Sequence, residues 1–196
     1  VLLIGHKNHP EVIGTMGQLP DGEIDLIENV EDVAKYDNKS GKELAYVTQT
    51  TLSVDDTKEI INEIKSRFNN VKEPNKNDIC YATTNRQKAV KEIAAKCDYF
   101  LVIGSPNSSN SLRLVEVAKN YGAKNCILIE NVNEVKTSIF NNTVSIGITA
   151  SASAPEVLVK NIINKLSKKF DLNIIESPFE KEDIHFKIPQ KLKEVS

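Results

Sequence analysis

The chain has 196 residues, of which 40% are hydrophobic and 27% are charged, with a formal net charge of −2 at pH 7. Its size predicts one or two α/β units with real cores, and its charge argues against binding to nucleic acid or to an anionic membrane. No apolar stretch reaches the roughly 18 residues of a membrane span. Three cysteines in a chain this long do not indicate a disulfide framework, so we expect a reducing, cytoplasmic setting.

The chain begins inside a pattern typical of a buried strand, Val1-Leu2-Leu3-Ile4-Gly5, without an initiator Met. Because native chains seldom begin within a core strand, we expect a fragment with residues missing upstream. Removal of an initiator Met would give the same start.

Short apolar runs rich in Val, Ile and Leu predict strands of parallel sheets that are covered on both faces. The predicted strands are Val1–Gly5, Ile24–Glu28, Leu44–Thr48, Tyr99–Gly104, Asn125–Ile129, Val144–Thr149 and Asn173–Glu176. In the tail, the alternating run at 184–188 predicts an edge strand or strap.

Amphipathic stretches between the strands predict helices, and capping residues mark their starts. The predicted starts are at Ser53, at Thr84, at Ser109 or Asn110, and at Ser153. Thr84 has Gln87 at the capping-box spacing, and Ser153 likewise has Glu156. Gly122 should end the third of these helices.

The polar stretch Asn69–Asp78 has no periodicity and predicts a linker. The fold class is therefore expected to be α/β, with two similar units that each contain a parallel sheet flanked by helices. We place these units at residues 1–74 and 75–168, with Cys80 in the second. We expect residues 169–196 to form a C-terminal strand or strap.

Polar residues gather in loops that each follow a predicted strand and precede a helix. These loops are residues 6–11, 48–51, 80–85, 105–110 and 151–155. Since ligands of open parallel sheets bind outside the carboxyl ends of strands, we expect these loops to converge on one cavity. Helix capping alone would explain one such loop, but the runs 48–51 and 107–110 exceed what one cap needs. Hydroxyls, amides and helix N-termini suit a phosphate or diphosphate, and the lack of a Walker or Rossmann glycine loop disfavours a nucleotide.

His9 and Glu11 flank Pro10 at the predicted start of a helix. An imidazole and a carboxyl in one loop can hold a hydroxyl and deliver protons, although surface solvation explains the spacing equally well. Arg86 and Arg113 lie within helices, where phosphate contact, solvation and ion pairing are all open.

Cys80 lies in a polar loop just ahead of a helix, where the helix N-terminus favours a thiolate. A thiolate either attacks a substrate or binds a metal. Cys97 and Cys126 lie on a helix face and in a core strand, so we interpret them as small buried hydrophobes. One thiolate cannot hold an iron–sulfur cluster, so metal binding would require ligands from outside this chain.

The residues alone therefore leave further functions open. One is a non-catalytic α/β module that binds a phosphorylated metabolite. Another is a hydrolase with Cys80 as nucleophile and His9 as base, which requires the two side chains within hydrogen-bond reach.

Several motifs in register carry a resemblance to a known family. They are Gly5-His6-Lys7-Asn8-His9-Pro10-Glu11-Val12, Gly14–Gln18, Thr48–Val54, Asp78–Gln87, Gly104–Ser111 and Thr149–Pro155. Over nearly the whole chain, this series strongly resembles the hydroxymethylbutenyl diphosphate reductase family (LytB/IspH) of non-mevalonate isoprenoid biosynthesis. The resemblance implies the second and third of three similar α/β units around a central cavity.

The resemblance also implies an activity. The family removes the hydroxyl of an allylic diphosphate alcohol to give isopentenyl and dimethylallyl diphosphate. It uses a 4Fe–4S cluster held by three cysteines and electrons from a ferredoxin or flavodoxin.

By the same resemblance, Cys80 is the third cluster cysteine. Glu11 is the acid at the reacting hydroxyl, and Thr50 is a hydroxyl partner beside it. The implied diphosphate-binding set is His9, Ser108, Ser109, Asn110 and Ser153.

Two departures accompany the resemblance. The other two cluster cysteines and two further substrate histidines belong to the family's N-terminal unit, so this chain alone should be inactive. Ser151 stands where the family usually has Gly, and it would be strained if that position required a positive φ.

Overall fold

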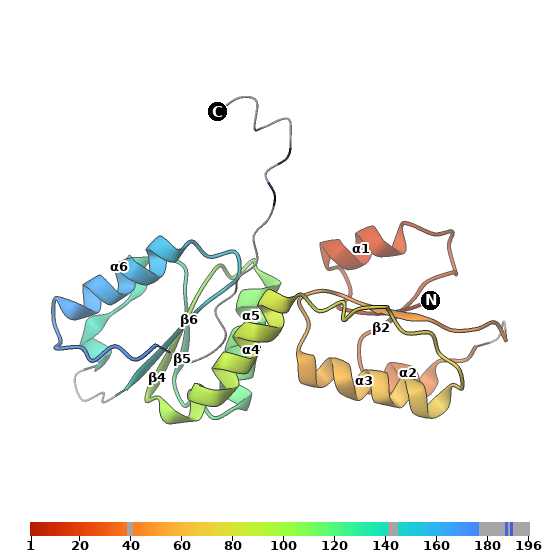
Figure 1. Cartoon of the computed structure of the whole chain (residues 1–196), viewed down its shortest axis with the longest axis horizontal. Helices are drawn as coiled ribbons and strands as arrows, with labels where there is room; N and C mark the ends of the chain where they lie inside the picture. The colour runs from red at the N-terminus through yellow and green to blue at the C-terminus, as the bar shows by residue number, and fades with distance from the viewer. Residues whose placement is uncertain (39–40, 141–144, 177–186, 188, 190–196) are drawn as a thin grey trace.

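The computed structural model of the chain describes residues 1–38, 41–140, 145–176, 187 and 189, and in them two three-stranded parallel sheets carry flanking helices (Figure 1). The first sheet has the order β2–β1–β3 and the second the order β5–β4–β6. The strands are β1 (Leu2–Ile4), β2 (Asp25–Ile27), β3 (Tyr46–Thr48), β4 (Tyr99–Ile103), β5 (Cys126–Ile129) and β6 (Ile146–Ala150). The predicted α/β class with two similar units is confirmed.

Helices lie on both faces of each sheet (Figure 1). They are α1 (Pro10–Met16), α2 (Val30–Lys35), α3 (Val54–Arg67), α4 (Tyr81–Ile93), α5 (Ser109–Asn120) and α6 (Glu156–Ser167). Leu2 packs in the cluster that contains Ile64 of α3, whereas Leu3 packs with Val12 of α1. Both faces of β1 are therefore buried, which is why its sequence lacks polar alternation.

The second sheet repeats this arrangement. Phe100 lies in the cluster that contains Leu114 of α5, and Leu101 lies with Ile162 of α6. All of these side chains are almost completely buried. Both sheets are thus held by apolar contact on two faces, which supplies most of their stabilisation.

Strand order creates a topological switch point at one end of each sheet, and the region between the diverging loops is called below the first crevice (after β1 and β3) and the second crevice (after β4 and β6). From β1 the chain passes to β2 on one side and then to β3 on the other, so the loops after β1 and β3 diverge. The loops after β4 and β6 diverge in the same way. Such topological switch points are where open parallel sheets bind ligands. Four of the five polar loops predicted from sequence follow β1, β3, β4 and β6.

Two predicted helix starts are confirmed in detail. Ser53 is the N-cap of α3, where its side chain accepts the Asp56 N–H at 3.2 Å. Ser108 is the N-cap of α5, so that helix begins at Ser109, and Gly122 follows its end with φ of +97°.

The predicted start of α4 at Thr84 is wrong, because the helix begins at Tyr81 with Cys80 as its N-cap. Thr84 lies one turn inside the helix, and its hydroxyl donates to the Cys80 carbonyl at 3.3 Å. A threonine hydroxyl can make this bond four residues back, so its presence does not mark a helix start.

The predicted capping box of α6 is also wrong. This helix begins at Glu156, its N-cap is Pro155, and no side chain caps it. Proline disfavours the helical conformation in the residue before it, here Ala154, so the helix cannot begin at Ser153.

The strand predicted at 173–176 is wrong too, because these residues form no regular element. Ile174 and Ile175 are 60% and 83% exposed. The run at 184–188 lies outside the described residues, apart from residue 187, and so does most of the tail assigned to 169–196. The division of the chain at residue 74 remains a prediction.

Helix α2 was not foreseen, although Asn29 and Asp32 carried the signal. The Asn29 side chain accepts the Asp32 N–H at 2.9 Å, which is the usual N-cap bond. Within the described residues, no helix combines the length and the apolar character needed to cross a bilayer.

Candidate functional site

The loop after β1 places His9 at the N-cap of α1, with Pro10 at the first helical position. The Nδ1 atom of His9 accepts the Glu11 N–H at 3.2 Å. Because Nδ1 serves as an acceptor, the ring proton of neutral His9 lies on Nε2. The outer nitrogen of His9 is therefore a hydrogen-bond donor.

Glu11 is held from the opposite side of the first crevice by Thr50. One carboxylate oxygen accepts the Thr50 N–H and the other accepts the Thr50 hydroxyl, both at 3.0 Å. This two-point attachment fixes the plane of the carboxylate. The sequence-predicted pair Glu11 and Thr50 is thus in direct contact although 39 residues separate the two positions.

Cys80 joins the same group through its backbone. Its N–H donates to the Thr50 carbonyl at 3.1 Å, so Thr50 contacts both the acid and the thiol-bearing residue. Cys80 is partly exposed beside a pocket of about 480 Å³. The residues that line this pocket are Asn77, Ile79, Cys80, Tyr81, Thr84 and Asn85.

The other two cysteines lie elsewhere and have a different character. Cys97 and Cys126 pack against the apolar cluster around Phe100. Burial is the main cause that raises the pKa of each thiol. A raised pKa keeps a thiol protonated and unreactive, so Cys80 is the suitable ligand or nucleophile among the three.

Within the described residues, the contacts of Cys80 do not include the pairing with His9 that a cysteine hydrolase requires. In the described part of the chain, no hydrogen bond joins Cys80 to His9, whose Nδ1 is occupied by the Glu11 N–H. The same residues contain no group of three or more His, Cys, Asp or Glu that could hold a metal ion. Cys80 itself is the N-cap of α4 and lines the pocket described above.

The second crevice brings together Ser108, Asn110 and Ser153 around Ser151. The Ser151 hydroxyl oxygen lies 3.1 Å from Asn110 Nδ2, 3.4 Å from Ser108 Oγ and 3.5 Å from Ser153 Oγ. Among the described residues other than glycine, only Asn8 and Asn70 have a positive φ. Ser151 is therefore unstrained, and the concern raised by its replacement of glycine does not apply.

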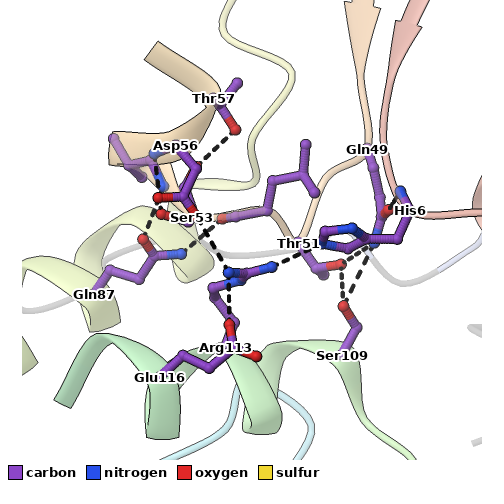
Figure 2. A network of polar contacts seen from close by, with 12 residues as sticks. His6, Gln49, Thr51, Ser53, Asp56, Thr57, Gln87, Ser109, Arg113 and Glu116 are labelled. Carbon is purple, nitrogen blue, oxygen red and sulfur yellow. Dashed lines mark hydrogen bonds and ion pairs between the residues drawn. The ribbon is translucent and has the colours of Figure 1, made fainter. Parts of the chain in front are cut away.

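Gln49 connects the two crevices (Figure 2). Its side chain is fully buried, its Oε1 accepts the His6 N–H at 3.0 Å, and its Nε2 donates to Thr51 Oγ1 at 3.0 Å. Nε2 also lies 3.4 Å from Ser109 Oγ, which accepts from Thr51 Oγ1 at 3.0 Å. The loops after β1, β3 and β4 thus share one hydrogen-bond network, and Gln49 was not singled out from sequence.

Arg113 lies beside this network rather than at an anion site (Figure 2). It forms ion pairs with Asp56 and Glu116, at 3.4 and 2.6 Å, and contacts His6 Nε2 at 2.7 Å. A guanidinium cannot accept, so His6 Nε2 must accept and the ring is neutral. Burial, followed by the charge of Arg113, lowers the pKa of His6 in agreement with this assignment.

Comparison with known proteins gives a consistent result. A model of the LytB protein family matches residues 1–167. The 4-hydroxy-3-methylbut-2-enyl diphosphate reductase of Ruegeria sp. (strain TM1040) is 48% identical over 193 residues, which cover 98% of this chain and 61% of the relative. The reductase of the same name from Rhizobium meliloti (strain 1021) is 49% identical, and the match covers 100% of this chain and 56% of the relative.

A solved structure agrees with these matches. The E-1-hydroxy-2-methyl-but-2-enyl-4-diphosphate reductase from Plasmodium falciparum superposes with a TM-score of 0.87 at 36% identity, covering 99% of this chain and 61% of that structure. The chain spans about three fifths of the length of the relatives that it matches. By sequence and by fold, the chain belongs to the LytB protein family.

Proposed function

We propose that this chain forms part of a 4-hydroxy-3-methylbut-2-enyl diphosphate reductase, which converts an allylic diphosphate alcohol to isopentenyl and dimethylallyl diphosphate. The observation that carries the proposal is the bonded series from Glu11 through Thr50 to Cys80. Through Thr50, it links the residue that carries a carboxyl to the residue that carries the thiol. The names of the relatives support the same activity.

The substrate diphosphate binds, in this proposal, at the second crevice with help from His9. Ser108, Ser109, Asn110 and Ser153 supply neutral donors, and α5 begins among them at Ser109. Aligned backbone N–H groups at a helix start favour an anion, and neutral donors hold it without burying a fixed positive charge.

Cys80 would serve as one of three thiolate ligands of a 4Fe–4S cluster. The remaining two cysteines, and two further substrate histidines, would come from an N-terminal unit outside this chain. When bound, such a cluster supplies electrons and a Lewis-acidic iron. A ferredoxin or flavodoxin would deliver the electrons, and the three free cysteines agree with a reducing, cytoplasmic compartment.

The reaction breaks the allylic C–O bond, consumes two electrons and two protons, and releases the hydroxyl as water. Glu11 is placed to hold the proton that the departing hydroxyl takes, directly or through the Thr50 hydroxyl. Thr50 keeps the carboxyl in one orientation, and His9 Nε2 donates to the substrate. The second proton forms the new C–H bond.

Anaerobic reconstitution with iron and sulfide tests the proposal, using this chain joined to the N-terminal unit of a matched reductase. Glu11→Gln keeps the side-chain shape but cannot deliver a proton, so turnover should fall by about 100-fold or more while iron content stays normal. Cys80→Ser should lose iron content, whereas the matched control Cys97→Ser should retain both iron and turnover.

Equal loss of iron and turnover in Glu11→Gln would refute the proton role of that residue. A protein that stays colourless after reconstitution yet hydrolyses esters would support the cysteine hydrolase instead.

A further inference from the structure

Ser151 occupies the centre of the second crevice, at the residue directly after β6. It is 1% exposed, and its backbone N–H donates to the Ile103 carbonyl at 2.8 Å. A Cβ atom added at Gly104 would lie only 3.0 Å from the Ser151 Cβ. Gly104, directly after β4, thus leaves room first for Ser111, whose Cβ would lie 2.9 Å from the added atom, and also for Ser151. The Ser151 hydroxyl lies among the side chains of Ser108, Asn110 and Ser153.

Asn110 is the neighbour that gives this hydroxyl a function. Its side chain is 5% exposed, and its Nδ2 donates to Ser151 Oγ at 3.1 Å. The other end of the amide, Oδ1, is buried and has no hydrogen-bond partner. A buried amide oxygen without a partner is costly, and in either orientation one end of the amide lacks a partner that a bound molecule could supply.

Rotation of the Asn110 amide by half a turn would exchange the positions of its two ends. Oδ1 would then face Ser151, and Nδ2 would occupy the place that Oδ1 now has. A serine hydroxyl both donates and accepts, so Ser151 can bond Asn110 in either orientation. A diphosphate oxygen only accepts, and it would therefore select the orientation in which Nδ2 faces it.

We propose that Ser151 is a positioning residue of the diphosphate site, which bonds the Asn110 amide in both orientations and lets it turn its N–H donors to the anion. This inference rests on the proposed function and extends it to a residue where the family resemblance led us to expect glycine. Glycine has no side chain to offer Asn110, so a chain with glycine here must satisfy that amide differently.

Titration of the chain with inorganic diphosphate, followed by ¹H–¹⁵N NMR, tests the inference. The wild-type spectrum should show the Asn110 side-chain NH₂ signal shifting with the same dissociation constant as the backbone signals of the loop at 105–110. Ser151→Ala should weaken binding about tenfold, because a buried hydrogen bond to Asn110 is lost. Ser151→Gly should weaken it at least as much.

Ser145→Ala is the matched control, because it removes a serine hydroxyl just before β6 at the opposite end of that strand. That hydroxyl bonds the Lys96 carbonyl at 3.0 Å and lies outside the crevice. We expect wild-type affinity from this variant. The backbone spectrum of each variant reports its fold independently of binding.

The possible outcomes distinguish failure of the diphosphate site from failure of the role assigned to Ser151. Absence of diphosphate-dependent shifts in the wild type would overturn the diphosphate site and this inference together. If the wild type binds diphosphate and Ser151→Ala binds it with the same affinity, the role of Ser151 alone is overturned. This holds even if the variant unfolds at a lower temperature. Equal shifts with sulfate at matched ionic strength would reduce the site to a general anion contact and would also overturn the inference.

Discussion

The fully buried amide of Gln49 determines what the Ser109 hydroxyl can do. Ser109 Oγ accepts from Thr51 and lies within bonding distance of Gln49 Nε2, which has only protons to offer. With both lone pairs engaged, the Ser109 hydroxyl has only its own proton left to share. A hydroxyl limited to donation suits an anionic ligand, which supports the proposed diphosphate site.

We expect Gln49→Leu to lower the free energy of unfolding by about 1–3 kcal/mol, because it removes buried hydrogen bonds from three loops. Urea unfolding monitored by circular dichroism measures this change. Gln18→Leu is the control, since Gln18 is exposed just after α1 and its Nε2 donates to the nearby Gly14 carbonyl at 3.0 Å. Similar losses in both variants would contradict the role assigned to Gln49.

At this scale the sequence revealed the polar loops but not their pairings. Gln49 lay within a recognised polar cluster, yet its partners His6 and Ser109 are 43 and 60 residues away, and no local spacing identifies them. The contact of Glu11 with Thr50 was expected only from the family resemblance. The concern about Ser151 was mistaken because its backbone conformation follows from β6 rather than from its residue type.

Single helices show which local signals determine structure. The Ser53 hydroxyl caps α3, whereas Ser153, at the same spacing from an acidic residue, lies near Ser151 and leaves α6 uncapped. The difference arises from Pro155, which lies between Ser153 and the helix. A capping pattern therefore predicts a start only where no proline lies between cap and helix.

This comparison predicts that a serine-to-alanine substitution lowers the free energy of unfolding by different amounts at Ser53 and at Ser153. Ser53→Ala should lower the free energy of unfolding by about 1 kcal/mol, because the Asp56 N–H loses its cap. Ser153→Ala should change it by less than about 0.5 kcal/mol, since no helix cap is lost. Urea titrations of the two variants measure both values, and an equal cost would mean that capping is not the relevant interaction.

Strands were predicted well where both faces are covered, as in Tyr99–Ile103, because an apolar run then directly reflects burial. The run at 173–176 has only two apolar residues between Asn173 and Glu176, and in the described part of the chain it pairs with no strand. Pairing is a property of the partner as well as of the segment, so the sequence of the segment alone could not settle it.

Polar contacts between the start of α3 and helices α4 and α5 add to the contacts that join the two sheet units. Asp55 accepts from Lys91 at 2.6 Å and from the Tyr121 hydroxyl at 2.8 Å. Gln87 of α4 is buried, accepts the Val54 N–H and donates to the Leu52 carbonyl. These directional contacts fix how the units face each other, and they were not predictable because they join distant segments.

Asp55 makes this junction sensitive to acid. Its hydrogen bond from Lys91 is the main cause that lowers the pKa of the carboxyl, burial opposes the shift, and Tyr121 adds to it. A carboxyl with a lowered pKa stabilises the fold above its ordinary pKa of about 3.9, and that contribution is lost as the pH falls through the lowered value.

We therefore expect Asp55→Asn to reduce stability at neutral pH and to flatten the fall of stability below about pH 4. Urea unfolding between pH 7 and pH 3 measures both effects. Asp21→Asn, at an exposed loop position, should leave the curve unchanged. A variant curve parallel to that of the wild type would exclude Asp55 as a source of the acid sensitivity.

The proposed catalytic and binding residues lie at the switch points, where the strands end. The opposite rims of the two sheets, where the strands begin, carry none of these proposed residues. Asp21, in the turn before β2, is exposed. A fluorophore or affinity tag attached there would stand on the far rim of its sheet. It could report on the molecule while leaving both crevices unobstructed.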